Sequence, residues 1–105
     1  MEDTIKTNET KKGPITLGFK VMTSGIAALL EDKTMTHAFI AECFQRHESC
    51  DYGVTCKEDS ELNDKSIPYK DRIMSAYIDP ISKIKVWIIT DAGWQTTTIL
   101  LPTEY

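Results

Sequence analysis

The stretch over residues 72–105 decides the fold. It reads RIMSAY at 72–77, KVWIIT at 85–90 and TTTILLP at 96–102, and it closes with TEY. Strongly β-forming residues dominate these three runs, and Asp79-Pro80 and Ala92-Gly93 mark turns between them. Connections this short join antiparallel strands. The sequence therefore predicts a three-stranded antiparallel meander sheet, with strands at roughly 72–78, 83–90 and 96–101.

The middle strand of this sheet is expected to be covered on both faces near its centre. Residues 86–89 read VWII, so apolar side chains point to both sides of the strand. We expect the helix that carries Phe39 and Phe44 to meet one face of the sheet. The N-terminal segment is the candidate for meeting the other face.

The N-terminal half supplies the helices. Residues 1–13 are polar and are expected to form a flexible arm, so the predicted single domain spans residues 14–105. Ile15, Leu17, Phe19 and Val21 alternate with smaller or polar residues, which predicts a possible extra N-terminal strand. Helices are predicted from a Ser24 cap to residue 30, from a Thr36 cap to about His47, and over the acidic residues 58–64. The fold class expected is α+β, with the sheet packed against the N-terminal helices.

Composition restricts the kinds of partner. A length of 105 residues suits one domain, and 41% hydrophobic residues support a folded core. The net charge of −4 argues against a nonspecific nucleic-acid binder, which normally carries a broad basic surface. No apolar run is long enough to span a bilayer and the N-terminus lacks a signal-peptide pattern, so we expect a cytoplasmic protein without a membrane contact. Its three cysteines are expected to be free thiols, and no cofactor is expected.

Cysteine and histidine residues offer an alternative as a structural zinc site. Cys43, His47, Cys50 and Cys56 form the pattern C-x3-H-x2-C-x5-C. A helical pair at positions i and i+4 can present two ligands on one face, and thiolates with an imidazole suit zinc. The pattern lacks a C-x2-C pair, however, and Cys43 lies on the apolar stripe of its helix. Core and incidental cysteines are the simpler interpretation.

A second alternative is catalytic. His47 is the natural general acid or base near neutral pH, and Arg72 could hold a phosphate. With Asp51, Ser75, Tyr77 and Thr90 nearby in the predicted fold, His47, Arg72 and Tyr77 would suit a metal-independent ribonuclease-like toxin. In the simpler interpretation these are ordinary helix and strand residues, because no nucleophile–base spacing is diagnostic.

Polar and aromatic residues on loops and on the third predicted strand suggest a surface for binding another protein. Trp94, in the turn over residues 91–94, is the contact residue we expect first if it is exposed. Threonines and aromatic rings on an exposed sheet face could contact a partner, although a threonine run is as often the outward side of a plain strand. The predicted binding residues are Asp51, Tyr52, Asp91, Trp94, Thr96, Thr98 and Tyr105.

The chain from His47 to Tyr105 resembles a family of small uncharacterised proteins of bacterial plasmids and phages, some labelled as a type I restriction enzyme subunit. The residues that carry the resemblance are His47, DYG at 51–53, Asn63, RIMSAY at 72–77, WIIT at 87–90, TTIL at 97–100, Pro102 and Tyr105. Cys50, Tyr52 and Asp91 depart from the family pattern, as does Gly93-Trp94, where the family has Asp-Arg. The resemblance implies a mobile-element accessory protein and brings no established activity.

These observations favour a non-enzymatic binding protein. We expect a phage or plasmid inhibitor of a host defence system such as CRISPR–Cas, whose partner is a defence protein or a ribonucleoprotein complex. Small size, acidic charge and the lack of catalytic motifs motivate this expectation. Gly93-Trp94, where the resembled family has charged residues, favours binding over the ribonuclease alternative.

Overall fold

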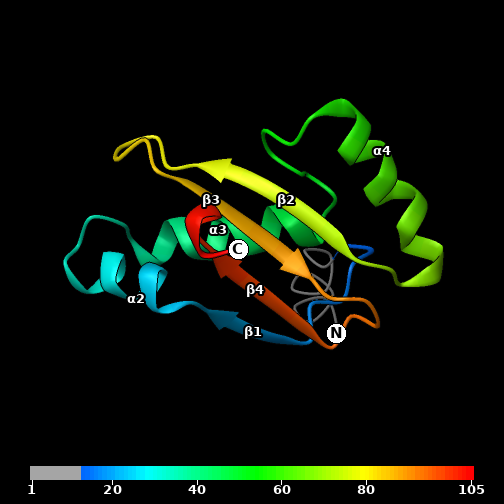
Figure 1. Ribbon diagram of the computed structural model, residues 1–105, viewed down its shortest axis with the longest axis horizontal. Helices are drawn as coiled ribbons and strands as arrows, with labels where there is room; N and C mark the ends of the chain where they lie inside the picture. The colour runs from blue at the N-terminus through cyan, green and yellow to red at the C-terminus, as the bar shows by residue number, and fades with distance from the viewer. Residues whose placement is uncertain (1–12) are drawn as a thin grey trace, which may run out of the picture.

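The computed structural model describes residues 13–105, which form an α+β fold (Figure 1). The predicted flexible arm over residues 1–13 therefore lies outside the described residues except for Gly13. Three α-helices precede the antiparallel strands along this part of the chain. In chain order the elements are β1 (Phe19–Met22), α2 (Ser24–Glu31), α3 (His37–Glu48), α4 (Lys57–Ser66), the 3-10 turn η1 (Ile67–Tyr69), β2 (Ile73–Ile78), β3 (Lys85–Thr90), β4 (Thr96–Leu100) and the 3-10 turn η2 (Pro102–Glu104).

The sheet has four strands in the order β1-β4-β3-β2. β2, β3 and β4 form the antiparallel meander that the sequence predicts. The possible extra N-terminal strand is present as β1, which joins the sheet beside β4 and runs parallel to it. The N-terminal segment therefore extends the sheet at an edge, and the expectation that it would cover the second face is wrong.

Gly18 explains why the N-terminal alternation misleads. The alternation predicts one strand with Ile15, Leu17, Phe19 and Val21 on one face, but only Ile15 and Leu17 are buried, while Phe19 is 79% exposed. Gly18 has a φ of +66°, and a Cβ atom there would lie 2.2 Å from the carbonyl oxygen of Gln95. Only glycine tolerates this backbone conformation and close approach. The chain turns at Gly18, and the side-chain pattern changes face before β1 begins.

Helix α3 covers one face of the sheet, which we call the packed face (Figure 1). Thr36 caps this helix by accepting a hydrogen bond from the N–H of Phe39, as its sequence predicts. Ile40, Cys43 and Phe44 are buried with Ile73, Tyr77, Val86, Ile88 and Ile99 of the sheet and with Ile15, Leu17 and Ile26. Burial of this apolar surface supplies the main stabilisation of the fold.

The opposite face of the sheet, which we call the open face, is nearest the viewer in Figure 1. Its side chains lie on the strands at Phe19, Val21, Met74, Trp87, Ile89, Thr96, Thr98 and Leu100. Within residues 13–105 the C-terminal turn η2 lies in front of this face, while α4 lies beyond the β2 edge (Figure 1). One face of the sheet therefore lies in the core, and the helices of residues 13–105 leave the other face largely uncovered.

Two further predictions meet small corrections. Helix α2 is capped by Thr23 rather than by Ser24, which is its first residue. Helix α4 runs over Lys57–Ser66, slightly longer than predicted, and Pro68 lies in the 3-10 turn that follows it. No helix in the described part of the chain is both long and apolar enough to cross a lipid bilayer.

Candidate functional site

His47 is the buried centre of a polar network on the packed face. It lies in the last turn of α3 and is 0% exposed. Its Nδ1 lies 2.6 Å from the hydroxyl of Ser75 in β2, and its Nε2 lies 2.8 Å from the hydroxyl of Thr90 in β3. Thr90 in turn contacts the Thr97 hydroxyl of β4 at 2.8 Å, and Thr97 donates to the carbonyl oxygen of Leu17 at 2.7 Å. One histidine thus joins the helix to three strands and the N-terminal segment.

The proton positions in this network follow from its end point. A carbonyl oxygen accepts only, so the single Thr97 hydroxyl proton points to Leu17. Thr97 must then accept from Thr90, and Thr90 must accept from the Nε2–H of His47. Nδ1 is left as the acceptor for Ser75. The network is complete when His47 is neutral with its proton on Nε2.

Burial keeps His47 neutral. It lowers the pKa of this imidazole to about 4, because the charged form would lose its hydration. Desolvation therefore outweighs the favourable interaction that a charged imidazole would have with the helix dipole at the C-terminal end of α3. Both ring nitrogens are also occupied, so nothing on this residue is available to a substrate.

The residues of the ribonuclease alternative lie on opposite faces of the sheet. Tyr77 points to the packed face, where its hydroxyl donates to the carbonyl oxygen of Asp51 at 2.6 Å and burial raises its pKa. Arg72 directs its guanidinium over the ring of Tyr105 on the open face, 5.2 Å from the ring centroid. His47, Arg72 and Tyr77 therefore do not converge on one reaction centre in this structure.

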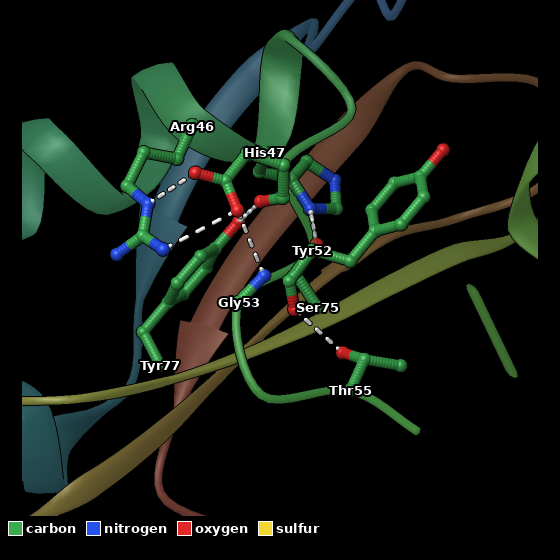
Figure 2. Close-up of polar contacts among 8 residues, drawn as sticks. Arg46, His47, Tyr52, Gly53, Thr55, Ser75 and Tyr77 are labelled. Carbon is green, nitrogen blue, oxygen red and sulfur yellow. Dashed lines mark hydrogen bonds and ion pairs between the residues drawn. The ribbon is translucent and has the colours of Figure 1, made fainter. Parts of the chain in front are cut away.

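Asp51 takes part in a surface cluster that fastens the loop after α3 (Figure 2). Its carboxylate accepts hydrogen bonds from the guanidinium of Arg46 at 2.7 and 3.3 Å and from the N–H of Gly53 at 3.1 Å. Arg46 also lies over the ring of Tyr77, 4.8 Å from its centroid. The Arg46 guanidinium holds the pKa of Asp51 below its ordinary value. Gly53 has a φ of +67°, a backbone conformation that favours glycine.

The structure does not assemble the predicted zinc ligands. Cys43 is buried in the core, where desolvation raises the pKa of its thiol to about 12, and both nitrogens of His47 are engaged. A cysteine binds zinc as its thiolate, and a histidine binds it through a free ring nitrogen. Cys50 is half-buried and Cys56 is exposed, and no cluster suited to a metal occurs among residues 13–105.

Two predicted binding residues are structural. Trp94 is only 5% exposed, so the expectation of an exposed contact residue is wrong. Its indole Nε1–H donates to the carbonyl oxygen of Asp71 at 2.9 Å, and Lys70 lies over its ring. Tyr52 is also buried, and its hydroxyl donates to Asp64 at 2.8 Å. Burial together with contacts to Cys50 and Asp64 raises the pKa of Tyr52.

The remaining predicted binding residues are accessible. Thr96 and Thr98 are half-buried on the open face, and Tyr105 is 70% exposed above it. Asp91 is exposed at the end of β3. Thr97, between the two accessible threonines, points the other way into the His47 network. The alternation along β4 thus explains why the TTT run has both a surface and a core role.

Tyr105 completes an aromatic cluster on the open face. Its ring meets that of Trp87 edge-on at a centroid distance of 5.6 Å, and its hydroxyl accepts a hydrogen bond from the Arg72 guanidinium at 2.6 Å. Phe19 and Val21 of β1 lie on the same face and are 79% and 45% exposed. Phe19, Val21 and Trp87 are not among the binding residues predicted from the sequence. The alternation of side chains along the strands could have placed Trp87 on the same face as Thr98. The change of face at Gly18 prevents the same prediction for Phe19.

Glu104 fixes the C-terminal turn that carries Tyr105. Its carboxylate accepts hydrogen bonds from the Thr23 hydroxyl at 2.5 Å, the Gly25 N–H at 2.9 Å and the Leu101 N–H at 2.9 Å. The Gly25 amide is at the N-terminus of α2, where a carboxylate is favoured. These contacts hold the pKa of Glu104 below its ordinary value.

Comparison with protein-family models, with curated proteins and with solved structures finds no match. Functional assignment therefore depends on the site itself and on the resemblance described above.

Proposed function

We propose that this chain is a non-enzymatic binding protein that contacts another protein through its open face. The observation that supports this is a continuous band of apolar, aromatic and threonine side chains across four strands. Val21, Thr98 and Met74, which are at least partly accessible, are in register across the sheet with the buried Ile89. In the adjoining row the half-buried Trp87 pairs with the buried Leu100 and lies beneath Tyr105. Aromatic and arginine side chains are enriched at protein interfaces and dominate their binding energy.

The chemistry of the interior supports binding over catalysis. The histidine that would serve as a general base is buried and fully hydrogen-bonded. The accessible surface instead offers the exposed ring of Tyr105, which follows a turn held by Glu104. An exposed aromatic ring beside an arginine suits a protein partner.

The partner in this proposal is a component of a bacterial host defence system such as CRISPR–Cas, either a protein or a ribonucleoprotein complex. The resemblance to plasmid and phage proteins supports that class. The net charge of −4 supports a partner with a basic surface, such as one that binds nucleic acid. The protein would act in the cytoplasm, where such systems operate.

An interference assay tests this proposal. Cells that carry an active CRISPR–Cas system would express the chain while plasmid or phage survival is measured. We expect the wild-type chain to restore survival and the Phe19→Ser and Tyr105→Ala variants to lose about tenfold or more of that effect, as for interface anchors. Ile81→Ser is the matched control, because Ile81 is 84% exposed in the β2–β3 turn, away from the open face.

Two outcomes would count against the proposal. One is a wild-type chain that leaves interference unchanged with every defence system tried. The other is full activity of Phe19→Ser together with Tyr105→Ala, because a partner on the open face must contact these side chains. Urea unfolding of each variant separates lost binding from lost folding.

A further inference from the structure

The two edges of the sheet differ in how their backbone groups are satisfied. At the β2 edge, the side-chain amide of Asn63 donates to the carbonyl oxygen of Met74 at 2.7 Å and accepts from its N–H at 3.1 Å. Farther along the same edge, the Val54 N–H donates to the carbonyl oxygen of Ala76 at 2.8 Å. The Ala76 N–H donates to the carbonyl oxygen of Tyr52 at 3.2 Å. Helix α4 and the loop after α3 therefore close this edge against another strand.

The β1 edge has no such cover within residues 13–105. The N–H groups of Phe19 and Thr23 donate inward, to Gln95 and Ile99 on the β4 side. Because backbone groups alternate along a strand, those of Lys20 and Met22 point outward from the sheet. All four residues of β1 are exposed. The edge is thus available to hydrogen-bond an added strand.

A groove runs beside this edge, between β1 and α3. It encloses about 330 Å³ and is lined by Lys20, Val21, Met22, His37, Ile40, Ala41 and Phe44. Its walls are mainly apolar, and the ammonium of Lys20 lies 5.8 Å from the centroid of the Phe44 ring. The volume is near the lower limit for small-molecule pockets, so it suits one or two inserted side chains.

We propose that the β1 edge and its groove bind an extended segment of a partner protein as a fifth strand of the sheet. The main chain of that segment would bond to the outward groups of Lys20 and Met22. Alternate side chains of an added strand point to the packed-face side, so an apolar side chain would enter the groove against Ile40 and Phe44. Strand addition of this kind obtains affinity from the backbone and specificity from the pocket.

The charge of the groove lining favours one kind of partner segment. The groove lining contains a lysine and a histidine and no carboxylate, and no carboxylate within residues 13–105 forms an ion pair with Lys20. An acidic residue beside the inserted apolar side chain therefore complements Lys20. A second copy of β1 fits less well, because it would bring its own Lys20 and exposed Met22 to the same edge and no carboxylate.

This inference rests on the proposed protein-binding function for its class of partner, but it depends on Lys20, Met22 and the groove rather than on the aromatic side chains of the open face. The test is selection from a displayed library of random twelve-residue peptides on the immobilised full-length chain, followed by affinity measurement with the synthesised peptides. We expect enriched peptides in which an apolar residue alternates with Asp or Glu. Their binding should perturb the backbone amide NMR signals of Lys20 and Met22.

Three variants connect the binding to the proposed geometry. Lys20→Glu should weaken the selected peptides about fivefold or more, because attraction becomes repulsion. Met22→Pro should weaken them about tenfold or more, because it removes an outward N–H that the fold does not use. Ile81→Ser, in the β2–β3 turn, should leave their affinity unchanged. Urea unfolding confirms that each variant is folded.

The inference is overturned if the library yields no binder at micromolar concentrations, or if the selected peptides bind Lys20→Glu and Met22→Pro as tightly as the wild type. It is also overturned if the chain sediments as a dimer that Met22→Pro dissociates, since a second copy would then occupy the edge. Loss of interference activity in Tyr105→Ala with peptide binding intact would support the open face separately, so the two proposals can fail independently.

Discussion

The buried neutral histidine makes a quantitative prediction about stability and pH. His47 has a pKa of about 4 in the folded chain, against an ordinary value of 6.5. Between these values the unfolded chain binds one proton more than the folded chain, so stability falls as pH falls. The contribution of His47 is fully present above pH 6.5 and is lost as pH approaches 4. Below that, this residue causes no further loss.

The size of the effect follows from the interval between the two pKa values. Protonation of His47 in the unfolded chain lowers the free energy of unfolding by about 3 kcal/mol in total. About 2 kcal/mol of this stability is lost between pH 7 and pH 5. A domain of this size has roughly 5–15 kcal/mol of stability in total, so the loss is readily measured. Urea unfolding at half-unit pH steps would give the free energy of unfolding at each pH.

His47→Gln is the matched control, because glutamine keeps an acceptor for Ser75 and a donor for Thr90 but does not titrate. We expect its stability to change less than that of the wild type between pH 7 and pH 5, by about 2 kcal/mol. Parallel curves for the two proteins over this range would refute the assignment of His47 as a buried neutral residue.

Four other predictions concern stability and the placement of surface groups. Ser75→Ala should lower the free energy of unfolding by about 1–3 kcal/mol in urea, since the buried Nδ1 of His47 loses its donor. Asn63→Leu should reopen the β2 edge, with a similar loss of stability and increased aggregation in light scattering; unchanged stability would argue against the edge contact. Trp94→Phe should cost about 1 kcal/mol through the lost indole donor and leave interference activity intact, whereas lost activity would restore Trp94 as a contact residue. Glu104→Ala should release the C-terminal turn and shift the NMR signal of the Trp87 indole, and in the wild type the same shift should appear as pH falls through the lowered pKa of Glu104.

Local patterns were sufficient to predict the meander and the main helix. The β-forming runs at 72–77, 85–90 and 96–102 are separated by clear turn residues, and Thr36 is a strong cap before an amphipathic helix. Each of these signals acts within a few residues of sequence. The extra N-terminal strand was predicted, but its place at the sheet edge was not, because Gly18 reverses the side-chain pattern inside an otherwise regular alternation.

The candidate site was harder to predict because its contacts join distant parts of the chain. Helical periodicity placed His47 near the apolar stripe, but its partners Ser75 and Thr90 lie 28 and 43 residues later. Trp94 reads as an exposed turn residue from its neighbours Gly93 and Gln95. It is buried because the turn packs on the segment before β2. There the carbonyl oxygen of Lys70 accepts from the Gly93 N–H, and the carbonyl oxygen of Asp71 accepts from the indole N–H of Trp94. Such tertiary contacts leave no local signal.

The most direct test of the central claim is quantitative affinity purification from cells that carry an active defence system. The wild-type chain, the Phe19→Ser/Tyr105→Ala double variant and the Ile81→Ser control would be compared by mass spectrometry. If the open face is the binding surface, one defence component should be enriched by the wild type and by Ile81→Ser, and should fall about tenfold or more with the double variant. Equal recovery of that component by all three proteins would contradict the account.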